Sequence, residues 1–547
     1  MHRREISMAL FASAAGAALL SKDAEAQTCT APCYARTAAE IAAGVTPTNL
    51  AYVPGDVRRY GADPSGTSDS SAAFATAGSL PGAVTIPPGT YTINTNITVG
   101  SPTVFSPGAI IKPASGRTIT LSSPLEAGIC QIFDLSSGGV VALPRIAGNV
   151  YAEWWGAAGD LVKTDNEVPI NQAIAALAVA VGGTFGGHVL LDRGDFYISD
   201  GINLTNQISL TGVSGQYPVL WASPGATFSA SGGRMVTALG GTTSMFNSRI
   251  ENLRINAGGL TSVVEVVYSN AWQEKCGLRN VVLENFTKLG FHYDTGIGGA
   301  CALKLSQVEC FLAASALPVA AGIKIEIPLS VGWIAVDLDQ ITVAGASANQ
   351  ANVSGIWLDG RIIGNCNAVH FENCNTGFEL VHAATLTGSG VTGDGGGTCT
   401  TVITCSGSWN GTINGLAFKK AGSANFIVDN SRGPYALANV EPANGFTVWP
   451  PDPSRAVSGA RVVGGATPSI SYQTGVVLSV THPATGQYRF TLGTSMDATV
   501  SYDVIAVSDL TTSVAINSAT QFDVFTRTPA GALADCNAIS VKVYHGP

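Results

Sequence analysis

The chain has 547 residues, with 28 Lys and Arg against 37 Asp and Glu, which gives a net charge of −9. Charged residues make up 12% of the chain, about half the roughly 25% of average globular proteins, while the hydrophobic share of 46% is ordinary. This composition excludes disorder, which requires low hydrophobicity and high net charge, and coiled coils, which are rich in charged residues. No basic surface is expected, so nucleic acid is not a predicted partner. A turn-rich, all-β protein remains.

The first 55 residues are predicted to be a signal-like or anchoring segment followed by a linker. Arg3 and Arg4 precede an apolar run, Met8–Leu20, and the triplet 24–26 has the small-residue pattern of a cleavage site. The paired arginines resemble a twin-arginine export signal that would be removed after residue 26. The alternative is an uncleaved helix that anchors the chain to a partner. No other segment has 18 consecutive apolar residues, so no membrane span is predicted.

Two segments about 95 residues apart repeat the same order of elements. The first has Tyr60-Gly61-Ala62-Asp63, a short helix near Ala72–Phe74, and a strand–glycine–strand unit over 84–93. The second has Trp155-Gly156-Ala157, a helix over Pro169–Val181, and a similar unit over 189–198. Apolar residues alternate in both units, as expected for strands with one buried face. We therefore predict two modules, over residues 56–150 and 151–435.

The motifs "YGADPSGTSDSSAAF", "VTIPPGTYTI" and "VYAEWWGAAGD" resemble the pectate-lyase-like right-handed parallel β-helix superfamily, of the phage tailspike or depolymerase type. The resemblance implies a parallel β-helix with short capping helices, a homotrimer in a virion tail, and a bacterial surface polysaccharide, capsule or lipopolysaccharide, as the partner. It also implies that the N-terminus contacts phage tail or baseplate proteins. It does not specify an activity, because this superfamily includes lyases, hydrolases, epimerases and adhesins.

The later sequence repeats with a period suited to β-helix rungs. Five aligned segments start 28, 27, 33 and 28 residues apart, at Asn252, Asn280, Gln307, Gln340 and Ala368, with apolar second and fourth positions. Each of four further strands begins with a glycine: Gly290, Gly322, Gly355 and Gly377. A single rung cannot bury its apolar row alone, so the rungs are expected to stack. The alternative, a β-sandwich, would not place glycines in register.

Beyond a proline cluster at 450–453, strands are predicted with hairpin-like spacing. They are Val476–Thr481, Tyr488–Leu492, Val504–Ser508, Phe522–Arg527 and Ile539–Tyr544. We interpret residues 436–547 as a small antiparallel β-domain. Its expected role is trimerisation or glycan binding, and the alternative is a monomeric cap on the end of the coil.

Alternation along the glycine-led strands turns their third and fifth positions outward. Stacking would then form two exterior rows, His292, Lys324, Trp357 and Glu379 beside Asp294, Glu326, Asp359 and Val381. Neighbouring carboxylates about 5 Å apart raise one another's pKa, so one can act as an acid while another stays ionised. We predict Asp294, Glu326 and Asp359 as catalytic carboxylates of a glycoside hydrolase. The other charged or aromatic side chains of the rows are predicted to bind substrate: His292, Lys324, Trp357 and Glu379.

Asp337 and Asp339 form a second candidate pair, predicted to bind substrate, because both point outward on the strand 334–341. Against both candidates stands the alternative that these are ordinary solvated charges. Clustered aspartates with an Arg or Lys base, typical of lyases, are not apparent, since arginine is scarce between residues 251 and 400. No cofactor or metal is predicted. Two cysteine pairs are disulfide candidates: Cys29 with Cys33, and Cys399 with Cys405.

Together these features predict a tailspike-like, trimeric protein that binds and hydrolyses a bacterial surface polysaccharide. Uncharged exterior positions at Val282, Phe311, Ala344 and Val381, with the segment Leu312–Ala321, favour a buried interface between copies. The alternatives are a non-catalytic receptor-binding or structural spike, and an exported bacterial glycanase or polysaccharide lyase with a periplasmic or extracellular location.

Overall fold

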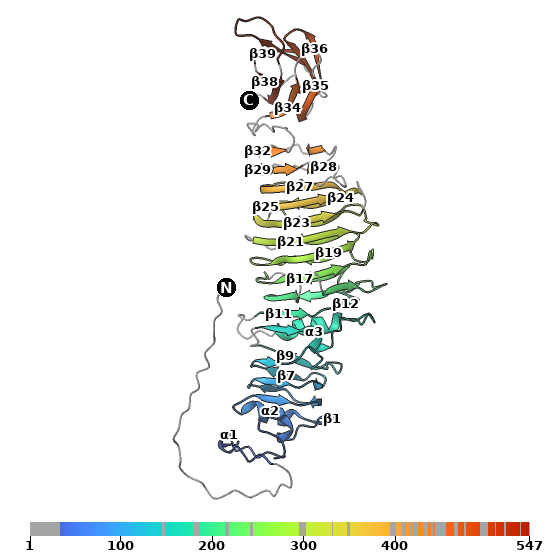
Figure 1. Cartoon of the computed structure of the whole chain (residues 1–547), viewed down its shortest axis with the longest axis vertical. Coiled ribbons are helices and arrows are strands. Elements are labelled where there is room, and N and C mark those ends of the chain that lie inside the picture. The colour runs from blue at the N-terminus through green and yellow to red at the C-terminus, as the bar shows by residue number, and fades with distance from the viewer. Residues whose placement is uncertain are drawn as a thin grey trace.

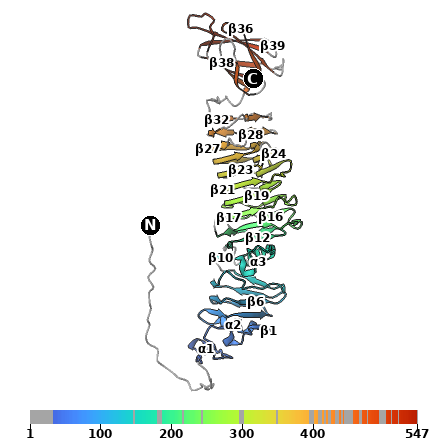
Figure 2. The same ribbon diagram turned by 45° about the vertical axis from the view of Figure 1, so that its right-hand side comes forward.

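In a computed structural model, most of the chain forms one long stack of parallel strands, with antiparallel strands after its last coil (Figures 1 and 2). The prediction of a right-handed parallel β-helix with short helices and a small C-terminal antiparallel domain is confirmed. The structure describes residues 33–144, 148–178, 186–213, 218–240, 244–294, 302–330, 332–346, 350–393, 401–406, 412–414, 417–419, 425–429, 436–438, 441–442, 456–463, 469–474, 477–492, 502–508, 510–518, 521–536 and 538–545. The predicted signal lies outside them.

The first module is a short β-helix with three faces. Each face is a three-stranded parallel sheet, and pairing joins strands that are one coil apart. Every strand is short because the chain turns a corner after two to five residues. The faces are β1 Ser65–Asp69, β3 Gly89–Ile93 and β6 Ala109–Pro113; β2 Val84–Ile86, β5 Thr103–Phe105 and β8 Leu125–Glu126; and β4 Ile97–Val99, β7 Thr118–Leu121 and β9 Val140–Ala142.

The two predicted openings share one local structure. A 3₁₀ turn, η1 Val57–Tyr60 or η2 Ala152–Trp155, ends at a left-handed glycine, and a helix follows, α2 Ser71–Ser79 or α3 Glu167–Leu177. Asp69 accepts hydrogen bonds from the backbone N–H groups of Ser71 and Asn94. Asp165 accepts the equivalent bonds from Glu167 and Ser199. The carboxylate thus ties the start of each helix to the end of the strand beside it.

A buried ion pair attaches the segment before the first opening. Arg59 is fully buried and binds both carboxylate oxygens of Glu40, at 2.6 and 3.0 Å. Its remaining donors reach the carbonyls of Tyr34, Ala35 and Tyr52. Glu40 lies in helix α1, Ala38–Ala42, whose Thr37 forms a capping box with it. Residues 34–45 are therefore packed against the β-helix.

The main coil has one 15-stranded and one nine-stranded parallel sheet. The larger sheet contains β10 Asn149–Tyr151, β11 Gly187–Leu191, β12 Asp195–Ile198, β14 Ile208–Gly212, β15 Val219–Ala222, β17 Arg249–Asn256, β19 Gly277–Phe286, β21 Ala302–Leu312, β23 Ile334–Ala344, β25 Ile362–Glu372, β27 Thr385–Gly393, β29 Thr412–Asn414, β30 Ala417–Lys419, β32 Ala436–Ala438 and β33 Glu441–Pro442. Parallel pairing thus continues a few residues past the predicted module end at 435.

The nine-stranded sheet carries the predicted glycine-led strands. Its members, in spatial order, are β13 Ile202–Leu204, β16 Arg234–Ala238, β18 Glu265–Ser269, β20 Leu289–Asp294, β22 Ala320–Glu326, β24 Gln350–Asp359, β26 Cys374–Val381, β28 Thr401–Ser406 and β31 Asn425–Asp429. The side chains between the sheets form a continuous apolar core along the stack.

The first residue of each of the five aligned segments is a bend and not the start of a strand. Asn252, Asn280, Gln307, Gln340 and Ala368 all have φ between 52° and 55°, within the long strands β17 to β25. Asn tolerates this left-handed conformation, and Asn280 also donates to the Asn252 amide oxygen at 2.8 Å. Each long strand therefore turns a corner at this residue and contributes to two faces of the coil.

The aligned glycines leave space for core side chains. A Cβ at Gly355 would overlap the ring of Phe371, and one at Gly322 would lie 2.5 Å from Val343 Cγ1. The glycine column is thus set by packing against the neighbouring face of the coil, and it aligns the strands that follow it.

The C-terminal strands form two four-stranded antiparallel sheets. One contains β34 Ala456–Val463, β35 Ser469–Thr474, β38 Tyr502–Ser508 and β41 Ala538–His545, and the other β36 Val477–Ala484, β37 Gln487–Leu492, β39 Thr511–Ser518 and β40 Gln521–Arg527. The five predicted strands correspond to β36, β37, β38, β40 and β41. The other three were not predicted.

The structure describes one cysteine of each of the two predicted disulfides. Cys33 is disulfide-bonded, and its predicted partner Cys29 lies outside the described residues. Cys405 is buried and is not disulfide-bonded, so the predicted pair with Cys399 is wrong. Within the described residues, no helix is long and apolar enough to cross a membrane.

Candidate functional site

The exterior of the nine-stranded sheet brings the predicted site residues into two rows. Strand pairing places His292, Lys324, Trp357 and Glu379 on successive rungs, and places Asp294, Glu326, Asp359 and Val381 beside them. The register is the one expected from the aligned glycines. The residues between the rows point inward and are fully buried, for example Ile325 and Leu358.

His292 lies at the centre of a chain of ion pairs across the rungs. Its Nδ1 is 2.6 Å from Glu265 Oε1, and its Nε2 is 2.9 Å from Glu326 Oε1. The other oxygen of Glu326 accepts from Lys324 Nζ at 2.6 Å, and the other oxygen of Glu265 accepts from Arg234 at 2.5 Å. The His292 side chain is only 8% exposed, so both ring nitrogens are committed to these carboxylates.

These contacts shift the pKa values of the groups in the chain. The hydrogen bond from His292, followed by the contact with Lys324, lowers the pKa of Glu326 to about 2 despite its partial burial. Burial alone would lower the pKa of His292, but the hydrogen bonds to Glu265 and Glu326 outweigh burial and raise it. Glu326 is therefore an ionised carboxylate, and His292 is stabilised as a cation between two anions.

The pKa of Asp294 is shifted in the opposite direction from that of Glu326. Partial burial raises the pKa of its carboxyl group, and the negative charge of Glu326 on the next rung raises it further. Within the described residues Asp294 makes no hydrogen bond or ion pair that would offset these effects. The pKa values of two carboxyl groups on adjacent rungs are thus shifted in opposite directions, upward for Asp294 and downward for Glu326.

Trp357 lies beside this pair on the next rung. Lys324 Nζ is 4.9 Å from the centre of its indole ring, a cation–π contact that covers part of one face. The indole N–H is buried and has no hydrogen-bond partner within the described residues. The side chain is held by its neighbours on the sheet and keeps a partly exposed surface suited to a sugar ring.

The remaining members of the rows have local partners. Asp359 lies 2.5 Å from His382 Nδ1, and Glu379 accepts a hydrogen bond from Ser354 at 2.7 Å. Val381, at the end of the carboxylate row, is buried. Asp359 is one rung from Glu326 and two rungs, or about 10 Å, from Asp294, so Glu326 has a carboxylate neighbour on each side.

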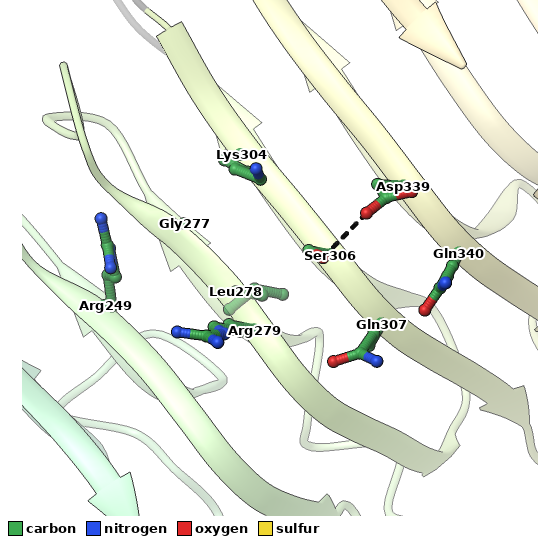
Figure 3. Close-up of a pocket in the computed structure, with 9 residues that line it drawn as sticks. All are labelled: Arg249, Gly277, Leu278, Arg279, Lys304, Ser306, Gln307, Asp339 and Gln340. Atoms are coloured by element: carbon green, nitrogen blue, oxygen red, sulfur yellow. Dashed lines mark hydrogen bonds between the residues drawn. The ribbon is translucent and has the colours of Figure 1, made fainter. Parts of the chain in front are cut away.

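The second predicted pair lies on the larger sheet, separated from the rows. Asp337 accepts a hydrogen bond from Asn365 at 2.9 Å, and Asp339 accepts from Asn367 at 2.7 Å and from Ser306 at 3.2 Å. Asp339 also lines a surface pocket of about 490 Å³ (Figure 3). The two candidate sites therefore occupy different faces of the coil.

Three residues of the site were not predicted: Arg234, Glu265 and His382. Strand β18 has no glycine in the aligned position, so Glu265 could not be placed in the rows by that signal. His382 follows the end of β26 and has a left-handed φ of 57°, which places its ring back against Asp359. Within the described residues, no group of three or more His, Cys, Asp or Glu side chains is arranged to hold a metal ion.

Comparison with known proteins gives only distant matches. No protein family profile and no curated protein sequence matches the chain. Among solved structures, ORF18 of Geobacillus virus E2 has a TM-score of 0.36 at 12% identity and covers 71% of this chain and 78% of its own. The Pseudomonas phage phi297 tailspike gp61 has a TM-score of 0.31 at 9% identity and covers 90% and 98%.

The A-module of the Azotobacter vinelandii mannuronan C-5 epimerase AlgE4 has a TM-score of 0.32 at 13% identity and covers 56% of this chain and 98% of its own. The fold described above rests on the strand pairings of the chain itself, and the chemistry of the site rests on its own residues.

Proposed function

We propose that this chain is a tailspike-like protein that binds a bacterial surface polysaccharide and hydrolyses it at the exterior rows of the nine-stranded sheet. The observation that carries the proposal is the adjacent pair Asp294 and Glu326, whose pKa values are shifted in opposite directions. Glycoside hydrolysis requires one carboxylic acid that donates a proton and one carboxylate that stays ionised. The sequence motifs that resemble tailspike β-helices support a virion location and a capsule or lipopolysaccharide substrate.

In this mechanism Asp294 donates its proton to the glycosidic oxygen. Glu326, held ionised by His292 and Lys324, attacks the anomeric carbon as the bond to the glycosidic oxygen breaks. A water molecule then displaces Glu326 from that carbon while the ionised Asp294 accepts a proton from the water. Adjacent rungs are about 4.8 Å apart, close to the roughly 5 Å carboxyl separation of retaining enzymes. We therefore propose retention of configuration. Trp357 would contact a neighbouring sugar ring, and Asp359 and Glu379 would accept hydrogen bonds from its hydroxyl groups.

Purified protein incubated with capsule or lipopolysaccharide from candidate hosts should release oligosaccharides, detected as new reducing ends. Asp294→Asn and Glu326→Gln should each lower the rate of release by about 10²-fold or more but retain binding. Glu274→Gln, an exposed carboxylate outside the rows, is the matched control and should be fully active. NMR of the first product formed reports the anomeric configuration. Equal turnover in all four proteins would refute the assignment.

One observation favours a second function, polysaccharide binding without hydrolysis. Both oxygens of Glu326 already accept hydrogen bonds, from His292 and Lys324, as in a purely structural ion network. A non-catalytic receptor-binding spike would retain glycan binding and release no oligosaccharide from any polysaccharide it binds. A binding measurement beside the release assay separates the two functions.

A further inference from the structure

The pocket on the larger sheet is formed by gaps in two columns of exterior side chains. One column, along the stack, contains Arg249, Gly277, Lys304 and Asp337, and the other contains Glu251, Arg279, Ser306 and Asp339. Gly277 and Ser306 are the small members, so each leaves a gap between larger side chains above and below it. Figure 3 shows the resulting hollow, with the side chains of Arg249, Lys304 and Arg279 around Gly277.

The gap at Gly277 is required by the backbone. Gly277 has a φ of 144°, and an added Cβ would overlap the carbonyl oxygen of Lys304. Any residue other than glycine is therefore excluded at position 277, which lies between the three cations. Because rungs are about 4.8 Å apart, the Cα atoms of Arg249 and Lys304 lie about 10 Å from each other across the gap. Arg279 is on the rung between them.

Two of the three cations at this end of the pocket, Arg279 and Lys304, have no ion-pair partner among the described residues. Both side chains are exposed. Arg249 is positioned by its bond to the Lys275 carbonyl at 2.9 Å and lies 3.4 Å from Glu251. Asp337 lies on the next rung from Lys304, but the guanidinium of Arg279 and the ammonium of Lys304 remain unpaired at this end of the pocket among the described residues.

The opposite end of the pocket has different chemistry. Asp339 accepts hydrogen bonds there, and the amide side chains of Gln307 and Gln340 can both donate and accept. A negative group is repelled from Asp339 and attracted toward Gly277, whereas sugar hydroxyls can bind to the carboxylate and amides. The pocket thus has a direction, with a cationic end and a hydroxyl-binding end.

We propose that this pocket binds an acidic sugar unit, with its carboxylate, sulfate or phosphate over Gly277 between Arg249, Arg279 and Lys304. The sugar hydroxyls bind at Asp339 and the glutamines. The inference rests on the proposed function for the carbohydrate nature of the ligand, but it concerns a separate face of the coil. It assigns an anionic polysaccharide as the partner.

Calorimetric titration of the full chain with trigalacturonate, a 6-sulfated galactotriose and neutral galactotriose tests the charge preference. We expect at least a tenfold preference for one of the anionic probes over the neutral one, and a loss of that preference in high salt. Which anionic probe binds more tightly distinguishes carboxylate from sulfate. Equal affinity for all three probes, or no binding of either anionic probe, would overturn the proposal.

Variants locate the binding and separate it from catalysis. Arg279→Ala combined with Lys304→Ala should remove the preference, while Arg117→Ala, an exposed arginine in the first module, should leave it intact. Asp294→Asn should also retain it, because Asp294 lies on the other sheet. Oligosaccharide release with no charge preference would refute only the pocket, whereas charge-selective binding without release would refute only the hydrolytic function. An unchanged preference in the double variant would place the anion elsewhere.

Discussion

At the scale of single residues, the candidate site depends on the opposite pKa shifts of Asp294 and Glu326. The pKa of Glu326 is about 2, so this group is ionised at any ordinary working pH. The pKa of Asp294 lies above its usual value of 3.8, and the proposed hydrolysis requires its protonated form. We therefore expect kcat/KM to fall as pH rises through the Asp294 pKa, with an acidic optimum.

Asp294→Asn should lower kcat by about 10²- to 10⁴-fold, the usual contribution of a general acid, and should remove this descending limb. The measurement is a pH profile of oligosaccharide release for the wild type, Asp294→Asn and Glu274→Gln. A descending limb that persists in Asp294→Asn would show that another group controls the pH dependence.

His292 should make stability depend on pH in the opposite sense from an ordinary buried histidine. Its ring contacts Glu265 and Glu326, and the ring of Tyr268 packs against it. Lys324 lies beside it on the next rung, and Asp294 lies two residues further along the same strand. Because its pKa is raised in the folded protein, its stabilisation is complete below the unfolded value of about 6.5 and is lost as pH rises through the folded pKa.

His292→Gln should therefore cost about 1.5–3 kcal/mol of unfolding free energy at pH 5.5, the range for hydrogen bonds to charged groups, and less at pH 9. Urea unfolding at the two pH values measures the difference. His370→Gln, at a partly exposed histidine that lies 3.0 Å from Glu372, serves as the comparison. A cost that is independent of pH would mean that His292 is neutral in the folded state.

At the scale of elements, the glycine column sets how closely two faces of the coil approach. Gly355→Ala would drive a methyl group into the ring of Phe371, so we expect a loss of about 1–3 kcal/mol, as in other overpacked cores. Gly332→Ala is the matched control, because an added Cβ there has no atom within 4 Å. Thermal unfolding of both variants tests this. Equal melting temperatures would mean that the strands shift freely to accommodate the methyl group.

The Arg59–Glu40 ion pair attaches the N-terminal segment, residues 34–45, to the β-helix. Arg59→Met would leave Glu40, 1% exposed, without its cation, at a cost of about 3–5 kcal/mol for a broken buried pair. The pKa of Glu40 is about 2 because of the hydrogen bond from Arg59, so the segment should also loosen below about pH 4. Limited proteolysis should cleave within residues 34–45 in Arg59→Met but not in Arg117→Met.

At the scale of the whole molecule, we expect a homotrimer. Ala344 and Val381, two of the predicted interface positions, are already buried within one chain, whereas Val282 and Phe311 are only half-buried. In the segment 312–321, Leu317 and Val319 are 36% and 50% exposed. Exposed apolar side chains beside an uncharged surface favour contact with another copy, although such residues are common singly.

Light scattering of the intact chain should give about three times 55.8 kDa. Leu317→Glu combined with Val319→Glu should shift the mass toward one chain without changing the circular dichroism spectrum. A wild-type monomer at micromolar concentration would contradict the trimer and would favour an exported glycanase.

The sequence by itself determined the fold class and the register of the candidate rows. The alternation of apolar residues predicts which side chains enter the core, and the glycine after each turn identifies equivalent positions on successive rungs. Asp294, Glu326 and Asp359 could therefore be aligned although 32 and 33 residues separate them.

Only the tertiary structure decided which neighbours these carboxylates have. Glu265 and Arg234 enter the site from rungs without the glycine signal, and His382 enters from a turn. The cations around Gly277 come from three rungs, and their convergence depends on the exact register and on the small side chains between them. The sequence pattern specifies which side of a strand a residue occupies, whereas contacts between rungs depend on turn conformations and side-chain directions that exist only in the assembled coil.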